Sequence, residues 1–142
     1  MEFHRKQKSN PIVVANIEKK LIDKNYQFLE CRIEKGILYC YGEYKPTSES
    51  TTYSYRIKYD PLDKPKVKVM KPVIAYNDDI HLYPKDNTLC LYHKTDLIWN
   101  TSCHLYDTII PWTHEWFVFY ELYQLTGKWL HPFVSHRKGN KK

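Results

Sequence analysis

The sequence is poor in the residues that build several common ligand sites. It has only 4 glycines and no Gly-x-Gly-x-x-Gly or Gly-x-x-x-x-Gly-Lys run, which excludes a glycine-rich phosphate loop. The longest apolar runs, such as Trp116 to Tyr120, are far too short for a membrane-spanning helix. His114 and Glu115 are adjacent, but position 118 is not histidine, which excludes a zinc-protease helix.

Cysteine is also scarce, with 4 residues in the chain. They lack the paired spacing of a zinc site and are too few for a secreted disulfide scaffold. The first residues are charged and contain no apolar signal core. We therefore expect a cytoplasmic protein with free thiols, without a cofactor and without a membrane partner.

Positive charge exceeds negative charge, with 22 Lys and Arg against 16 Asp and Glu. Much of the excess lies at the two ends of the chain, which usually form solvated tails. We expect basic tails at 1–9 and 135–142 around a single domain at 10–134. No basic stripe interleaved with aromatics is present, so nucleic-acid binding is only a minor alternative, recognisable by a steep salt dependence.

The first part of the domain predicts one helix. Asn10 and Pro11 form a helix start, because the asparagine side chain caps it and proline needs no N–H there. The helix should end near Asn25. Its apolar residues recur at helical spacing and are expected to face the core: Val13, Val14, Ile17, Leu21 and Ile22. Its charged residues are expected on the opposite face: Glu18, Lys19, Lys20 and Asp23.

Four strands should follow the helix, with a turn at Lys35-Gly36 between the first two. The third is the clearest, because aromatic or apolar residues alternate with polar ones through it. The expected strands are 28–33, 37–44, 52–59 and a short one through Val67 and Val69 that ends at Pro72.

A long irregular segment, 73–110, and a last helix complete the chain. The segment is rich in proline, asparagine and aspartate, and loops of this length in a compact domain are usually functional. The helix should begin near Pro111 and end at a Gly127 cap. Helix, four-stranded antiparallel meander, long loop and helix make an α+β fold.

The long segment contains a motif that resembles the active-site region of ubiquitin-conjugating enzymes. His81 begins a loop, Cys90 follows nine residues later and is followed by Leu91, and Trp99 lies nine residues further on. The resemblance covers roughly 10–130 and implies the conjugating fold. It also implies acyl transfer, in which a cysteine thiolate takes an acyl group as a thioester and yields it to an amine.

The end of the chain resembles the bacterial conjugating-type proteins of cyclic-oligonucleotide anti-phage (CBASS) systems, in a stand-alone form. The motifs that carry this are Pro111-Trp112, Glu115-Trp116, Tyr120-Glu121 and 126–129. The resemblance implies a protein acyl donor as partner, through a nucleotidyltransferase or ubiquitin-like C-terminus, and leaves a separate activating enzyme open.

The same resemblance assigns roles to individual residues. Cys90 would be the nucleophile and His81 the residue that holds the loop, while Trp99 would shape the surroundings of the thiol. Asp96 would orient an incoming lysine. The basic residues near the first helix would dock an activating enzyme, although a solvated face is the simpler interpretation: Arg5, Lys6, Lys19 and Lys20.

One departure from the family pattern leaves the oxyanion donor open. The family has asparagine two residues after the histidine, and this chain has Tyr83. Tyr83, Asn87, Thr88 or a backbone N–H are the candidates to replace it. The departure also leaves a second function open, in which a catalytically inactive conjugating fold only binds a partner.

Two alternatives for the cysteines stay open. Free cysteine is among the most buried residue types, so Cys90 is a core thiol if the motif is accidental. Cys103, in the same long segment, is then the second candidate nucleophile. A zinc site from Cys90, His93, Cys103 and His104 is not expected, because the adjacent Cys103 and His104 would have to converge on one ion.

Overall fold

The computed structural model describes residues 10–131. It has the predicted α+β order of elements: α1 (Pro11–Asn25), β1 (Glu30–Glu34), β2 (Ile37–Tyr44), β3 (Tyr53–Tyr59), β4 (Lys66–Lys71) and α2 (Ile109–Thr126). The basic tails expected at 1–9 and 135–142 lie outside the described residues. Neither of the two helices in this described part has the length and apolarity needed to cross a membrane.

The start of α1 follows the prediction. The Asn10 side-chain oxygen accepts hydrogen bonds from the N–H groups of Ile12 at 2.9 Å and Val13 at 3.4 Å. These are two of the N–H groups that a helix start leaves without an intrahelical partner. The helix therefore begins where the cap satisfies its first turn.

The predicted core face of α1 is wrong for several residues. Val13 and Ile17 are 52% and 49% exposed, whereas Glu18 is 1% exposed. The Glu18 carboxylate accepts hydrogen bonds from His104 Nδ1 at 2.6 Å and from the Leu105 N–H at 2.8 Å. These bonds replace the hydrogen bonds to water that the carboxylate loses when it is buried. Because α1 has apolar residues on both sides, its periodicity alone does not select the buried face.

The four strands form one antiparallel sheet in the order β1-β2-β3-β4. Lys35 and Gly36 connect β1 to β2 with φ angles of 53° and 79°. Two consecutive positive φ angles define the two-residue turn whose twist matches a β-hairpin. The turn therefore fixes the register of β1 on β2, with Glu34 opposite Ile37.

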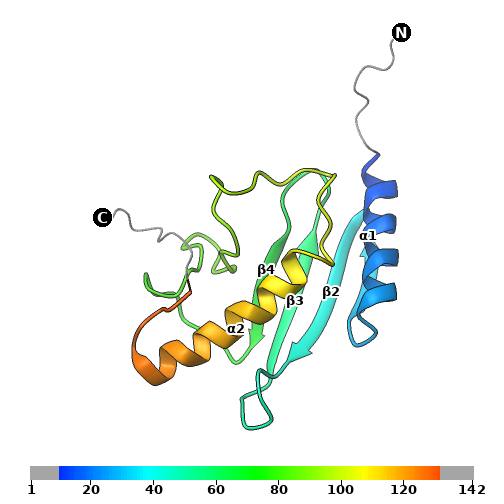
Figure 1. The fold of residues 1–142 in the computed structure, drawn as a ribbon. Helices are drawn as coiled ribbons and strands as arrows, with labels where there is room; N and C mark the ends of the chain where they lie inside the picture. The colour runs from blue at the N-terminus through cyan, green and yellow to red at the C-terminus, as the bar shows by residue number, and fades with distance from the viewer. Residues whose placement is uncertain (1–9, 132–142) are drawn as a thin grey trace.

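The core lies between the sheet and α2. In β3 the alternation holds as predicted, with Tyr53, Tyr55, Ile57 and Tyr59 buried on one face. Phe117 of α2 stacks on Tyr53 at 4.5 Å between ring centroids. Figure 1 shows α2 crossing this face, and α1 packs beside β1 and β2.

The irregular segment from 72 to 108 runs from the β4 side of the sheet across one end of it toward α1, and then into α2 (Figure 1). Glu18 fixes its far end to α1 through the two hydrogen bonds described above. The near end holds the residues singled out from the sequence.

Candidate functional site

A tight turn holds Cys90. The N–H of Cys90 donates to the carbonyl of His81 at 2.9 Å, and the N–H of Tyr83 donates to the carbonyl of Thr88 at 2.8 Å. The turn thus brings His81, Tyr83 and Cys90 together.

This turn is attached to the sheet through the leucine that precedes Cys90. The N–H of Leu89 donates to the carbonyl of Val67 in β4 at 2.8 Å, and Leu82 pairs with Leu89 as an isolated antiparallel bridge. Leu82, Leu89 and Leu91 are all buried. The apolar neighbours of Cys90 are therefore core residues, and they fix the position of its backbone.

His81 organises the turn mainly through its backbone and its ring stacking. Its φ angle of 55° lies in the left-handed region, where histidine is found more often than most residues. Besides the Cys90 N–H, its carbonyl accepts the indole N–H of Trp116 at 3.3 Å. Its ring is buried and stacks on Trp129 with centroids 5.3 Å apart. These contacts fit a residue that supports the loop.

Cys90 is only 2% exposed. Burial raises its pKa, because the thiolate loses solvation. A hydrogen bond with Tyr83, the positive charge of Lys64 and hydrogen bonding with the Tyr92 backbone each act in the opposite direction without cancelling the effect of burial. The Sγ atom also lies 3.6 Å from the Tyr92 carbonyl. The site therefore holds a protonated thiol with donors positioned for its thiolate.

Tyr83 is a neutral hydrogen-bond donor to this thiol. Burial and the neighbouring Cys90 raise the pKa of its phenol, so the hydroxyl keeps its proton. The Nζ atom of Lys64 lies 4.3 Å from the centroid of the Tyr83 ring, a cation–π contact. Lys64 in the β3–β4 loop thus supports Tyr83 from the side of the ring and adds positive potential near Cys90.

The other candidate donors in the turn are engaged in holding its shape. Asn87, with a φ of 60°, donates from its side-chain amide to the carbonyl of Ile74 at 2.7 Å. The Thr88 hydroxyl donates to Asp86 at 2.6 Å, and that bond helps to lower the pKa of Asp86. Of the side chains that the sequence left open as donors, Tyr83 is the one that hydrogen-bonds the thiol.

A cleft of about 380 Å³ lies beside this turn. Tyr83, Lys64 and Trp99 are among its lining residues, and Trp99 is fixed there by donating to the Tyr59 hydroxyl at 3.1 Å. The cleft is therefore walled by the turn, the β3–β4 loop and the segment around Trp99. Trp99 thus shares this cleft with Tyr83.

Asp96 and Cys103 lie outside the hydrogen-bonded turn that holds Cys90, although Cys103 is near enough to Tyr92 to act on its phenol. Asp96 is exposed, and its backbone N–H donates to the His93 carbonyl at 2.8 Å. The Cys103 N–H donates to the carbonyl of Asn100 at 3.0 Å, and its thiol is half-buried. Within residues 10–131 no group of three metal-binding side chains gathers, so the zinc arrangement of Cys90, His93, Cys103 and His104 does not form.

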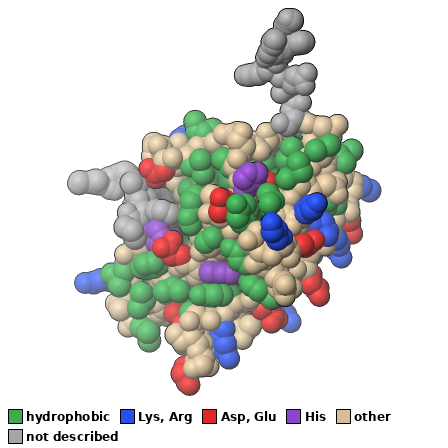
Figure 2. All heavy atoms as spheres, turned by 45° about the vertical axis from the view of Figure 1, so that its right-hand side comes forward, with side chains coloured by type: hydrophobic (Ala, Val, Ile, Leu, Met, Phe, Trp, Pro, Cys, Tyr) green, Lys and Arg blue, Asp and Glu red, His purple; other side chains and the backbone are tan. Residues whose placement is uncertain are grey.

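Of the four basic residues proposed for docking, Lys19 and Lys20 lie within the described residues. Lys19 forms an ion pair with Asp23 at 2.7 Å, Lys20 is exposed, and Arg5 and Lys6 lie outside the described residues. On the face shown in Figure 2, Lys and Arg stand among acidic and hydrophobic side chains rather than in a continuous basic stripe. That face does not have the charge pattern of a nucleic-acid interface.

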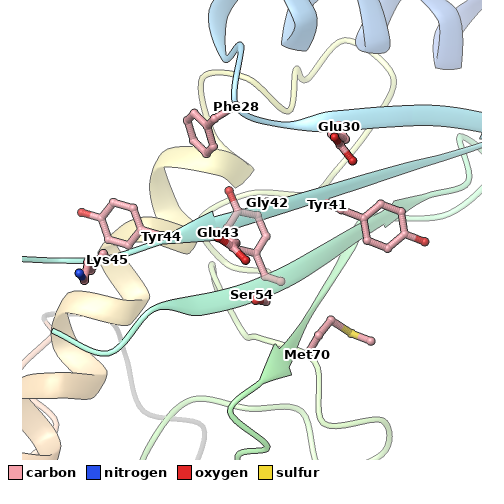
Figure 3. Close-up of a pocket in the computed structure, with 10 residues that line it drawn as sticks. Phe28, Glu30, Tyr41, Gly42, Glu43, Tyr44, Lys45, Ser54 and Met70 are labelled. Atoms are coloured by element: carbon pink, nitrogen blue, oxygen red, sulfur yellow. The ribbon is translucent and has the colours of Figure 1, made fainter.

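Another hollow of the described residues lies elsewhere. It measures about 810 Å³ and is bordered by Phe28, Tyr41, Tyr44 and Met70, with Glu30 and Glu43 beside them (Figure 3). None of its lining residues is a cysteine or histidine. Its size therefore gives no reason to move the candidate site away from Cys90.

Sequence reasoning missed three contacts of the turn that holds Cys90. Lys64 precedes Cys90 by 26 positions in another loop, Trp129 follows α2, and the Tyr92 backbone was not considered. A long-range contact of this kind leaves no periodic or spacing signal in one sequence. Only the Tyr92 backbone was accessible to reasoning, because it lies two residues from the thiol.

The fold and this site define a class of protein. A meander of four strands flanked by two helices, with a cysteine held by a histidine-led turn after the last strand, is the arrangement of a ubiquitin-conjugating-type protein.

The comparison with protein families gives the particular group. The model of the family described as Type II CBASS E2 protein matches residues 18–137, which is most of the chain. The chain belongs to this family of E2-like anti-phage proteins. Among curated proteins, none matches it.

Proposed function

We propose that Cys90 is an acyl carrier that forms a thioester with the C-terminus of a partner protein and passes it to a target amine. The observation that carries the proposal is the turn of 81–90, which fixes Cys90 and directs the Tyr83 hydroxyl to its sulfur. Membership of the Type II CBASS E2 family supports it.

The chemistry needs one nucleophilic sulfur and a stabilised oxyanion. The thiolate attacks the carbonyl carbon of an activated C-terminus, and the activating group leaves with its electron pair. An amine nitrogen then attacks the same carbon, the Cys90 sulfur leaves as thiolate, and the amine loses a proton to solvent. Each step passes through a tetrahedral oxyanion, which a fixed hydrogen-bond donor stabilises by about 3 kcal/mol.

Tyr83 is the donor that we assign in place of the family asparagine. Its phenol is neutral, it hydrogen-bonds the sulfur, and Lys64 lies on its ring. A donor at this position lowers the pKa of the thiol before acylation. Once the sulfur is acylated, the same hydroxyl is free to turn to the oxygen bonded to the reacting carbon.

The partners follow from the family. CBASS E2 proteins act with other CBASS proteins, and we propose a nucleotidyltransferase or ubiquitin-like C-terminus as the acyl donor. An extended C-terminal peptide fits the cleft of about 380 Å³ beside Tyr83 and Trp99. An activating enzyme would supply the adenylate or thioester from which Cys90 is loaded.

Thioester trapping tests the proposal. The protein is co-expressed with the products of its neighbouring genes and analysed by intact mass and non-reducing gels as wild type, Cys90→Ser and Cys103→Ser. We expect an adduct on the wild type and on Cys103→Ser that thiol reductant or hydroxylamine removes. The Cys90→Ser adduct should resist the reductant, because it is an oxyester. A reductant-resistant adduct on Cys103→Ser instead would move the nucleophile to Cys103.

A binding scaffold is the second candidate function. The observation that favours it is the burial of Cys90, which raises the pKa of its thiol and limits access to it. Under this function the partner co-purifies with wild type and Cys90→Ser equally, and no adduct forms on either. That result would contradict acyl transfer and leave the family membership intact.

A further inference from the structure

Two other cysteines, Cys31 and Cys40, lie directly opposite each other on neighbouring strands. They are register partners of β1 and β2, and their sulfur atoms are 2.9 Å apart as free thiols. Neither residue belongs to the turn that holds Cys90, and the acyl chemistry does not use them.

The hairpin turn determines which kind of pair they form. In a hairpin with a two-residue turn, the pair flanking the turn exchanges both backbone hydrogen bonds, and the pairs alternate from there. Glu34 and Ile37 flank the turn at Lys35-Gly36, so Cys31 and Cys40, three pairs further on, form a non-hydrogen-bonded pair.

This position is suited to a disulfide. The Cα atoms of a non-hydrogen-bonded pair lie about 4.5 Å apart, with the side chains close together. Disulfides need Cα atoms roughly 4.4 to 6.8 Å apart. The backbone of the hairpin therefore does not have to move for a bond to form between the two sulfurs.

The two thiols differ in access and acidity. Cys31 is half-buried, and the neighbouring thiol together with the positive charge of Lys19 lowers its pKa. Cys40 is buried, and burial and the nearby Cys31 raise its pKa. Cys31 is therefore the more acidic and the more accessible of the two, and it is the one that a small reagent reaches first.

We propose that Cys31 and Cys40 are an oxidation site at which a peroxide closes a cross-strand disulfide. The Cys31 thiolate attacks one peroxide oxygen, the O–O bond breaks, and the other oxygen departs as hydroxide. Cys31 is then a sulfenic acid. The Cys40 sulfur then attacks the Cys31 sulfur, the S–O bond breaks, and the departing hydroxide takes the Cys40 proton to form water. Two thiols are oxidised by two electrons, and the peroxide is reduced to water.

Peptide mapping after peroxide treatment of the folded protein tests the proposal. Hydrogen peroxide is added, free thiols are blocked with N-ethylmaleimide, and the chain is digested with trypsin. Cleavage after Arg32 and Lys35 separates the two cysteines into peptides 25–32 and 36–56. We expect these two peptides joined by a disulfide that reductant cleaves, with Cys90 and Cys103 carrying the maleimide label.

Matched variants define the site. Cys31→Ser should lose the cross-linked peptide, and Cys103→Ser, which removes another half-buried thiol, should keep it. The same treatment in urea should give mixed pairings, because the pairing is imposed by the folded hairpin.

Three outcomes would overturn the proposal. One is labelling of all four cysteines after peroxide treatment of the folded protein. Another is conversion of Cys31 to sulfinic acid without any cross-link to Cys40. The third is a disulfide that joins Cys90 or Cys103 to another cysteine in the folded wild type.

Discussion

Cys90 and Cys31 represent two opposite ways of placing a thiol in the same domain. Cys90 is buried in a hydrogen-bonded turn, and the loss of solvation raises its pKa despite Tyr83 and Lys64. Cys31 is half-buried on an edge strand, and a second thiol at 2.9 Å and Lys19 lower its pKa. The family resemblance points to Cys90, whereas local electrostatics makes Cys31 the more reactive thiol toward small reagents.

The difference separates general thiol reactivity from acyl-transfer chemistry. Reactivity toward a small electrophile depends on thiolate population and access. Acyl transfer depends also on a place for the acyl chain and a donor for the oxyanion. The cleft lies beside Tyr83, whose hydroxyl hydrogen-bonds Cys90, so a labelling experiment by itself would not test the carrier that we propose.

The largest effect that sharpens this comparison is expected in alkylation rates. With iodoacetamide at neutral pH, Cys31 should react about 100-fold faster than Cys90, because both its pKa and its exposure favour attack. Time-resolved peptide mapping of the folded protein measures the two rates. Faster labelling of Cys90 would mean that the turn opens readily in solution and would reverse the comparison.

A substitution at Tyr83 addresses the other side of the comparison. Tyr83→Phe removes the hydroxyl that bonds the thiolate while keeping the ring under Lys64. Hydrogen bonds to charged groups contribute about 1.5–3 kcal/mol, so thioester formation at Cys90 should slow by at least about tenfold. Single-turnover loading with the co-expressed partners measures this rate.

Tyr92→Phe is the matched control for Tyr83→Phe. The Tyr92 side chain lines the same cleft, but its hydroxyl has no hydrogen-bond partner among the described residues. Loading of this variant should stay close to the wild-type rate. Equal losses in the two variants would show that packing in the cleft, and not the Tyr83 hydroxyl, sets the rate.

The pH range over which the two thiols can be compared depends on His114. Burial lowers its pKa from 6.5 to about 4, and its ring is stacked on Tyr44 at 4.1 Å and hydrogen-bonded to Tyr55 at 2.8 Å. Between these pH values the unfolded chain binds more protons than the folded chain, so stability rises with pH.

The free energy of unfolding should therefore fall as the pH drops from about 6.5 to about 4. After allowance for partial exposure of the ring, the loss should be about 1–2 kcal/mol. Urea unfolding at pH 7 and pH 4.5 measures it, and His114→Phe should flatten the dependence. A wild-type profile no steeper than that of His114→Phe would contradict the assignment. The two thiols are therefore best compared at neutral pH, above this window.

The smallest effect is expected at Lys64. Lys64→Met keeps most of the side-chain length and removes the charge that lowers the Cys90 pKa. Because the lysine is exposed, the pKa of Cys90 should rise only slightly, and high salt should have the same effect in the wild type. Thiolate absorbance against pH in a Cys31→Ser background measures it. A salt-independent pKa would contradict the electrostatic role.

Local signals account for the parts of the fold that were predicted well. The Asn10 cap, the Lys35-Gly36 turn, the alternation of β3 and the Gly127 cap with φ 77° each depend on a few adjacent residues. The family motif placed His81 and Cys90 in one turn for the same reason, since nine residues can close such a loop.

The parts that were not predicted depend on contacts far apart in the chain. Glu18 is buried because His104 and Leu105 lie 86 and 87 residues away in sequence and provide its partners. Lys64 reaches the site from another loop. The Cys31–Cys40 pair is an intermediate case, because the two-residue turn fixes its register and makes the pairing accessible to reasoning from the sequence.

The burial of Cys90 also bears on the lifetime of a loaded protein. Water needs the same path to the sulfur-bound carbonyl as any other nucleophile, and Cys90 is only 2% exposed. An acyl group carried there would be shielded from hydrolysis until a partner opens the turn. Burial would then both slow thioester formation and slow thioester hydrolysis. The acyl group would be released when the acceptor binds rather than by chance hydrolysis.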